Sequence, residues 1–226
     1  MQYFRLIIII FFVSSCNQTQ HEKHEFKFSS FNMVLAQSTK DHISDTSFIT
    51  MQDYAKDFVY DMKYASPDNF LKSTIYDCDQ CLLRKEVADA LIEANAAFTE
   101  MGLGIKFYDC YRPLSVQKQM WEVFPNPRYV ANPYKSGSMH NRGGAVDITL
   151  VDSLGNELDM GTPFDYFGKE AHHDYTELPE HILTNRKLLK STMETYSFRA
   201  IRTEWWHYSF RNARQYPLSN EQPNCD

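Results

Sequence analysis

The sequence predicts an α+β fold in which helices flank a mostly antiparallel central sheet. Helical and alternating segments follow one another without the regular strand–helix–strand order of a parallel sheet. The clearest strand, residues 145–151, has an apolar face and an opposite face that carries Asp147 and Thr149. The chain has 226 residues, 43% hydrophobic and 15% aromatic, which suffices for one core or one core plus a tail.

The N-terminal residues 1–15 are typical of a secretory signal. Arg5 precedes an apolar run from Leu6 to Val13, which is too short to cross a bilayer, since a helix needs about 20 residues for that. The following Val13-Ser14-Ser15-Cys16 resembles a bacterial lipobox. We therefore expect a lipoprotein with Cys16 acylated, facing the periplasm or exterior of a bacterial cell envelope. The alternative is an ordinary signal cut near Ser15 that leaves Cys16 as a free thiol.

Residues 16–50 are polar and lack sustained periodicity, so we expect a lipidated N-terminus and flexible tether. His21, His24 and His42 lie in this segment and offer an accessory metal patch, although a solvated linker is the simpler interpretation. The folded domain is expected at 51–226.

Within this domain, residues 58–64 predict a strand that leads into a turn at 67–69. A helix that ends at Gly102 is predicted from one apolar face, formed by Leu83, Val87, Leu91, Ala94 and Phe98.

Residues 104–110 alternate as a second strand, and a helix is expected at 114–124, followed by a loop to about residue 138. After the strand at 145–151, a further helix is marked by residues 188–196, and the aromatic-rich segment 202–210 predicts a last strand.

The charge balance excludes one class of partner. The chain carries 23 basic and 29 acidic residues, a formal net charge of −6, and no run of lysine or arginine. Nucleic acid is therefore not expected as the main partner, and no protein partner is predicted.

Two short stretches hold the residues that suggest chemistry: residues 138–147 (SMHNRGGAVD) and 204–207 (EWWH). Two histidines and one aspartate, here His140, His207 and Asp147, suffice to hold a catalytic zinc whose fourth position is left for water. Glu204 would then remain as the base that takes the proton of that water.

Strand geometry poses a difficulty for this arrangement. Positions three apart on a regular strand face opposite sides, so Glu204 and His207 could not both face one metal. Either Glu204 precedes the regular strand, or a β-bulge turns its side chain toward the metal.

Each residue also has a structural interpretation. Asp147 could be a strand-edge carboxylate paired with Arg142. The adjacent His172 and His173 have diverging side chains and are more typical of a loop than of one metal site, and Trp205 with Trp206 is more typical of a core or a pocket wall.

Taken together, the motifs resemble the zinc D-alanyl-D-alanine dipeptidases, which include the vancomycin-resistance dipeptidase, within the hedgehog/DD-peptidase superfamily. The resemblance extends from about Tyr60 to Tyr208. It rests on motifs in the family's order: YASPDNF (64–70), CLLR (81–84), YDCYRP (108–113), the His140 motif, MGTPFD (160–165) and EWWHY (204–208).

The resemblance implies a hydrolase that cleaves the free dipeptide D-Ala-D-Ala with one Zn²⁺ per chain. His140, Asp147 and His207 match the family's zinc ligands and Glu204 its general base. Arg112 matches the arginine that stabilises the oxyanion. Among the substrate-binding residues, Asp165 and Tyr64 match those that recognise the substrate's ammonium, and Ser138 the residue that contacts the other end of the dipeptide.

Three of these residues have simpler roles to consider as well. Arg112 could pair with a carboxylate, Asp165 could cap its loop, and Ser138 could bind only backbone.

Two other functions are also consistent with the motifs: a murein D,D-carboxypeptidase that trims longer peptides, and a non-catalytic binding lipoprotein that kept the metal site.

The remaining cysteines predict disulfides, because the expected compartment is oxidising. Cys78 could pair with Cys81, or Cys81 with Cys110, and Cys225 could reach a third partner or stay free. The Cys78-x-x-Cys81 spacing has no second pair of cysteines to complete a zinc finger.

In some relatives an aromatic residue helps to hold the substrate carboxylate. This role is not assigned to Tyr76, because the segment 71–77 does not align clearly with those relatives.

Overall fold

The computed structural model of the protein describes residues 44–225. The expected signal (1–15), the acylation site Cys16 and the histidines at 21, 24 and 42 lie outside the described residues. Among the helices within the described range, none has the length and apolar character needed to span a membrane.

The domain contains two sheets. Its strands are β1 (Phe48–Thr50), β2 (Val59–Tyr60), β3 (Leu82–Arg84), β4 (Leu103–Asp109), β5 (Ala145–Asp152), β6 (Phe198–Ile201) and β7 (Glu204–Phe210). Its α-helices are α2 (Met51–Tyr54), α3 (Lys85–Thr99), α4 (Leu114–Val123) and α5 (Glu180–Thr195), with 3₁₀ turns at Lys63–Ala65, His140–Arg142, Lys169–Ala171 and Ala213–Gln215.

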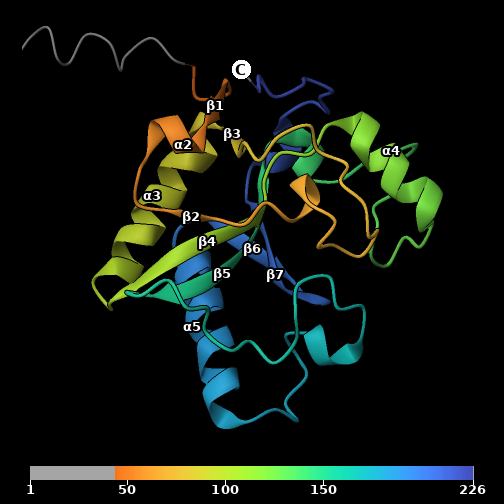
Figure 1. Ribbon diagram of the computed structural model, residues 1–226. Coiled ribbons are helices and arrows are strands. Elements are labelled where there is room, and N and C mark those ends of the chain that lie inside the picture. The colour runs from red at the N-terminus through yellow and green to blue at the C-terminus, as the bar shows by residue number, and fades with distance from the viewer. Residues whose placement is uncertain (1–43, 226) are drawn as a thin grey trace, which may run out of the picture. The chain divides into compact units, whose positions relative to one another are not determined.

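The main sheet has five strands in the order β2-β4-β5-β7-β6 (Figure 1). The β2–β4 pair is parallel and the other three pairs are antiparallel. This topology confirms the predicted α+β fold with a mostly antiparallel sheet.

The second sheet pairs β1 with β3, so the folded part begins before residue 51. The carbonyls of Asp45 and Ser47 accept backbone hydrogen bonds from Glu86 and Lys85 at the start of α3. The segment that was expected to be the end of the tether is thus hydrogen-bonded into the domain.

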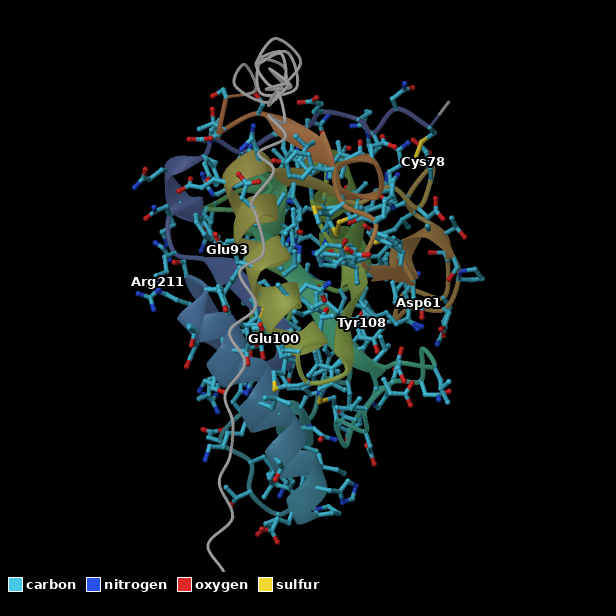
Figure 2. All side chains as sticks on the ribbon, turned by 90° about the vertical axis from the view of Figure 1, so that its left-hand side faces the viewer. Asp61, Cys78, Glu93, Glu100, Tyr108 and Arg211 are labelled. Atoms are coloured by element: carbon cyan, nitrogen blue, oxygen red, sulfur yellow. A yellow bond between two sulfur atoms is a disulfide. The ribbon has the colours of Figure 1, made fainter. Side chains whose placement is uncertain are left out.

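Two long helices cover one face of the five-stranded sheet (Figure 1). The buried side chains of α3, among them Leu91 and Phe98, join one apolar core with Val146, Ile148 and Leu150 of β5. Figure 2 shows the opposite face of α3, which carries the exposed glutamates at 93 and 100 toward solvent. Burial of the apolar face on the sheet is the main stabilisation of such a helix.

Several boundaries differ from the sequence expectation. Leu83 belongs to β3, and the helix begins at Lys85. α5 begins at Glu180, directly after Pro179 and well before residue 188. Its first turns are too polar to show a clear apolar stripe, so the sequence pattern did not reveal them. The segment 202–210 is not one strand: residues 202 and 203 form a turn between β6 and β7.

The expected strand at 58–64 is reduced to β2, because the chain turns inward at Lys63–Ala65. Tyr64 is buried there, and its carbonyl accepts hydrogen bonds from the backbone N–H groups of Ile75 and Tyr76, at 3.0 Å each. This inward turn carries Tyr64 away from the sheet edge.

The four cysteines of the domain form two disulfides, Cys78–Cys225 and Cys81–Cys110. The second is one of the two alternatives left open by the sequence, and the first gives Cys225 a partner. Figure 2 places Cys78 beside the C-terminal segment, at the same end of the molecule as β1 and β3. The buried Cys81–Cys110 bridge ties β3 to the end of β4.

Candidate active site

Three neighbouring strands place acidic and imidazole side chains in one row across the sheet. The register pairs Asp109 of β4 with Asp147 of β5, and Asp147 with His207 of β7. Directly opposed residues in a sheet have Cβ atoms about 5 Å apart, so the row brings these side chains into contact. The first pairing depends on a register shift between Phe107 and Asp109, which is typical of a β-bulge.

His140 joins this row from the 3₁₀ turn that precedes β5. Its Nε2 lies 3.1 Å from Nδ1 of His207 and 3.3 Å from Oδ1 of Asp147, and the same Nδ1 and Oδ1 atoms are 3.0 Å apart. All three residues are buried. Among the described residues, this cluster is the group of three or more candidate ligands that could hold one metal ion.

The spacing of the three donor atoms fits a tetrahedral zinc site. Zinc binds imidazole nitrogen and carboxylate oxygen at about 2.0–2.2 Å, so two tetrahedral donors lie about 3.3 Å apart. The observed 3.0–3.3 Å matches that spacing. Each of the three residues can present a lone pair to one cation, so the donor set fits the ion that the sequence predicts.

The other nitrogen of each histidine is fixed by a neighbour. His140 Nδ1 lies 2.7 Å from the carbonyl of Cys110, to which it donates, and His207 Nε2 lies 2.9 Å from Oγ of Ser209. These bonds leave Nε2 of His140 and Nδ1 of His207 directed at the cluster. Such outer hydrogen bonds orient metal-binding imidazoles. The Cys81–Cys110 disulfide therefore anchors the carbonyl that orients His140.

The charges in the cluster shift each other's proton affinity. Burial alone would lower the pKa of His140, but the carboxylates of Asp147 and Asp109 outweigh it and raise that pKa. Burial raises the pKa of Asp147, yet the two histidines hold it well below its usual range. Burial holds the pKa of His207 below its ordinary value. Asp147 is thus ionised and His207 neutral at physiological pH, the forms that bind a metal.

Arg112 lies beside this cluster, at the exit of β4. Its guanidinium makes two hydrogen bonds to Oδ2 of Asp109 and one of 3.0 Å to Gln117, and Nη2 lies 4.0 Å from Asp147 Oδ2. The pairing with a carboxylate that the sequence allowed is therefore present. Arg112 nonetheless lines the same cleft as His140 and Glu204, so it is both paired and available to a bound molecule.

Glu204 and His207 line this one cleft although they are three residues apart on β7. Glu204 is the first residue of the strand, and the pairing with β6 shifts register between Ala200 and Ile201. Strict alternation therefore does not hold along β7, which removes the geometric difficulty. Burial, with the nearby Asp147 and Asp165 carboxylates, raises the pKa of Glu204 well above its ordinary value.

Asp165 and Tyr64 meet at another wall of the cleft, where the Tyr64 hydroxyl donates to Oδ2 of Asp165 over 2.9 Å. Asp165 adopts a left-handed backbone with φ of 58°, an uncommon conformation that is typically held by the surroundings at functional sites. Burial, together with the charge of Asp147, raises the pKa of Asp165 to about 8.

The other candidate residues have structural contacts. Ser138 lines the cleft, but its Oγ accepts a hydrogen bond of 3.2 Å from the backbone N–H of His140. Arg142 donates to the carbonyls of Tyr216 and Ser136 rather than pairing with Asp147. His172 and His173 lie outside the metal-binding cluster.

Sequence reasoning assigned no role to Asp109, which is fully buried and holds Arg112. It also accepts a 2.6 Å hydrogen bond from the hydroxyl of Tyr76. A signal for it was present: Asp109 continues the alternation of Ile105 and Phe107, so an acidic residue stands where the strand is otherwise apolar.

The cleft has a volume of about 480 Å³. Besides the residues above, aromatic side chains line one wall, where Phe167 stacks on Tyr129 with ring centroids 4.6 Å apart. The fold and the site thus define a buried three-donor metal centre in a cleft, with a carboxyl and a guanidinium group beside it.

Comparison with known proteins identifies the class. The model of the peptidase M15 family, described as D-Ala-D-Ala dipeptidase, matches residues 44–224. The D-alanyl-D-alanine dipeptidase of Escherichia coli (strain K12) is 38% identical over 146 residues, 65% of this chain and 75% of that protein. The enzyme of the same name from Enterococcus faecium is 30% identical over 152 residues, 59% of this chain and 75% of that protein.

Among solved structures, a complex of VanYB with D-alanine-D-alanine is similar with a TM-score of 0.39 and 14% identity, covering 62% of this chain and 79% of that one. The protein is a zinc metallopeptidase. It belongs to the peptidase M15 family of D-Ala-D-Ala dipeptidases.

Proposed function

We propose that this protein hydrolyses the free dipeptide D-alanyl-D-alanine to two molecules of D-alanine, with one Zn²⁺ per chain. The observation that carries the proposal is the cleft itself: Glu204 and Arg112 line it together with the three metal-donor residues. A site that only held a structural ion would need neither of these two side chains. The identity of 38% to a curated dipeptidase supports the choice of reaction.

We assign the metal to Nε2 of His140, Oδ1 of Asp147 and Nδ1 of His207, whose mutual distances of 3.0–3.3 Å suit one tetrahedral ion. A bound zinc supplies Lewis acidity, which polarises the scissile carbonyl and makes water more acidic.

Glu204 is the proposed general base. Its pKa is raised well above the ordinary value by burial and by Asp147 and Asp165, so it has a higher affinity for a proton than an exposed glutamate. It accepts one proton from the attacking water, and it delivers this proton to the leaving amine when the C–N bond breaks. The carboxylate is thereby regenerated, and the amine and the carboxylic acid of two D-alanines are released.

Arg112 stabilises the negative charge that develops on the scissile oxygen. Asp109 and Gln117 hold its guanidinium from behind by three hydrogen bonds, so no reorganisation is needed when the charge appears. A fixed donor of this kind contributes about 3–4 kcal/mol to the transition state in other enzymes.

Asp165 and Tyr64 make the enzyme specific for a free dipeptide. The Asp165 carboxyl accepts a hydrogen bond from Tyr64 and lies in the same cleft, where it would meet the substrate's ammonium. A peptide extended at its N-terminus lacks this ammonium, so it would forgo the ion pair with the buried Asp165 carboxyl group. Ser138 would contact the other end of the dipeptide.

The test is hydrolysis by the full zinc-loaded chain of three substrates: D-Ala-D-Ala, its N-acetylated form and a pentapeptide stem that ends in D-Ala-D-Ala. We expect D-alanine release from the free dipeptide alone. Comparable rates with the blocked or longer substrates would instead identify a murein D,D-carboxypeptidase, and no release from any of them would identify a binding protein.

The variant Glu204→Ala tests the role of Glu204 as the base, because it leaves the three metal-donor residues in place. It should retain zinc while kcat falls by at least about 10²-fold, the contribution of a positioned base. Zinc content is measured by atomic absorption on the same sample. Full activity in this variant would show that the base lies elsewhere.

We further propose that the protein is anchored to a bacterial envelope membrane through an acylated Cys16. The support is the sequence Val13-Ser14-Ser15-Cys16 after a short apolar run. Labelled palmitate should enter the wild-type chain and not a Cys16→Ala variant, and equal labelling of both would contradict the anchor.

A further inference from the structure

A second pocket, separate from the cleft, lies along α5 and has a volume of about 340 Å³. Its polar and charged lining comprises His173, Arg186, Lys187, Lys190, Ser191 and Glu194. Three basic side chains therefore share the pocket with one carboxylate, Glu194, which lies 3.9 Å from Nζ of Lys190. The pocket thus has an excess of positive charge, whereas the whole chain is net negative at −6.

Arg186 lines this pocket and has no carboxylate partner in direct contact. It is 4% exposed. Its Nε donates to the carbonyl of Met160 over 2.7 Å, and its Nη1 donates to the carbonyls of Glu170 and His172 over 2.9 and 3.3 Å. Within residues 44–225, this guanidinium forms no ion pair with an acidic side chain, although the charge of Asp159 acts on it at longer range, and its Nη2 is buried without a hydrogen-bond partner. A buried charge without a counter-ion is unfavourable.

Two more buried polar atoms stand nearby without a partner. They are Nε2 of His173 and the hydroxyl of Tyr208, whose rings lie 6.3 Å apart between centroids. Burial, with the charges of Lys190 and Arg186, lowers the pKa of His173 to about 4. His173 is therefore neutral and adds no charge to the pocket.

We propose that this pocket binds a small oxyanion of the phosphate or sulfate class. The ammonium groups of Lys187 and Lys190 would donate hydrogen bonds to it, and the charge of the Arg186 guanidinium, whose Nη2 is covered by protein, would attract it at longer range. A tetrahedral oxyanion offers several acceptors at once, which suits two ammonium groups three residues apart on one helix. A neutral ligand would leave the Arg186 charge uncompensated, and a cation would be repelled.

The pocket belongs to the face of the sheet that α5 covers. Tyr208 follows the metal-donor residue His207 directly, and the backbone N–H of His173 donates to the carbonyl of Arg202 over 2.8 Å in the turn before Glu204. The pocket is thus separate from the cleft, but its lining residue His173 contacts the turn at residues 202 and 203, which directly precedes the proposed base Glu204. The proposal does not depend on the dipeptidase activity.

The test is a titration of inorganic phosphate into the full, zinc-loaded, ¹⁵N-labelled chain at constant ionic strength, with chloride as the balancing anion. We expect saturable shifts in the amide signals of residues 173 and 186–191. Sulfate should displace phosphate. Shifts confined to the residues of the cleft, such as 140–147, or no saturable shift around α5, would overturn the proposal.

A pair of variants adds a second, independent readout. Lys187→Ala with Lys190→Ala removes two charges from the lining without disturbing the buried hydrogen bonds of Arg186, and phosphate should then bind about fivefold more weakly. The matched control is Lys56→Ala with Lys135→Ala, two exposed lysines outside the pocket lining, which should leave the affinity unchanged. Equal affinities in both double variants would contradict the site.

Discussion

Arg112 and Arg186 are both buried, 8% and 4% exposed, but their charges are compensated in opposite ways. Arg112 binds the carboxylate of Asp109, whereas Arg186 is surrounded by the neutral carbonyls of Met160, Glu170 and His172. Burial lowers the pKa of both, but Asp109 outweighs it and raises the pKa of Arg112 well above the ordinary value. The pKa of Arg186 falls to about 10.

This difference shows what each site is built to receive. In the cleft, the protein supplies its own countercharge, so Arg112 is held in position whether or not a substrate is present. Beside α5, the Arg186 guanidinium contacts only dipoles and the Asp159 carboxylate acts on it at longer range, so much of the positive charge remains for a ligand to neutralise. Four substitutions test this contrast, given from the largest expected effect to the smallest.

Replacing Asp109 with Asn should have the largest effect on stability. It removes the paired carboxylate and leaves the Arg112 charge buried, a change that costs about 3–5 kcal/mol in comparable buried pairs. The measurement is the free energy of unfolding by denaturant, with disulfides intact. Asp174→Asn is the control, because Asp174 pairs with Arg202 where both side chains are about 60% exposed, and it should cost less than about 1 kcal/mol.

Replacing Arg112 with Gln should lower kcat/KM by about 10²–10³-fold, the loss found when one oxyanion donor is removed. Zinc content should not change, because Arg112 is not among the three donors. Arg199→Gln is the matched control, since Arg199 is an exposed arginine of the same cleft. If both variants lost activity equally, the effect would be one of general charge in the cleft.

Replacing Arg186 with Gln should destabilise the protein less than Asp109→Asn does. The variant loses hydrogen bonds to three carbonyls, but it also removes an uncompensated charge, so the two effects partly cancel. We expect a loss of about 1–2 kcal/mol in the free energy of unfolding without phosphate. A loss as large as that of Asp109→Asn would mean that the Arg186 charge is compensated by the protein after all.

The sequence was informative about residue types and weak about register. The pattern at 138–147 and 204–207 was sufficient to group His140, Asp147 and His207, because their chemistry and order are specific. The row that joins Asp109 to Asp147 was not visible, since it depends on a bulge in β4 that shifts the pairing by one residue. Alternation rules assume a regular strand, and bulges are frequent beside active sites.

The burial of Arg186 and the pairing of Cys78 with Cys225 could not be predicted from the sequence, because both depend on tertiary packing. Arg186 lies on a helix whose polar positions all resemble a solvated face, and its burial follows only from the packing of the loop at 160–172 against α5. The Cys78–Cys225 pair joins residues 147 positions apart, so no local spacing could indicate it. Contacts set by tertiary packing leave little trace in local patterns.

The smallest effect is expected from Asp165→Asn, and it depends on pH. The pKa of Asp165 is raised to about 8 in the folded protein, so the folded state keeps a proton that the unfolded state loses from about pH 4 upward. Folding therefore becomes less favourable as pH rises from about 4 to 8, and the variant, which cannot ionise, escapes this loss. Between pH 5 and 6 its advantage in free energy of unfolding should grow by about 1 kcal/mol in the metal-free protein.

Asp152→Asn provides a control of opposite sign for this experiment. Hydrogen bonds from Asn156 lower the pKa of Asp152, so its contribution to stability is present above about pH 4 and is lost only as pH falls further. The difference between Asp152→Asn and the wild type should therefore stay flat from pH 5 to 8. A flat difference for Asp165→Asn as well would show that the Asp165 carboxyl is already ionised at pH 5, so that its charge, like that of Asp109, is compensated within the protein.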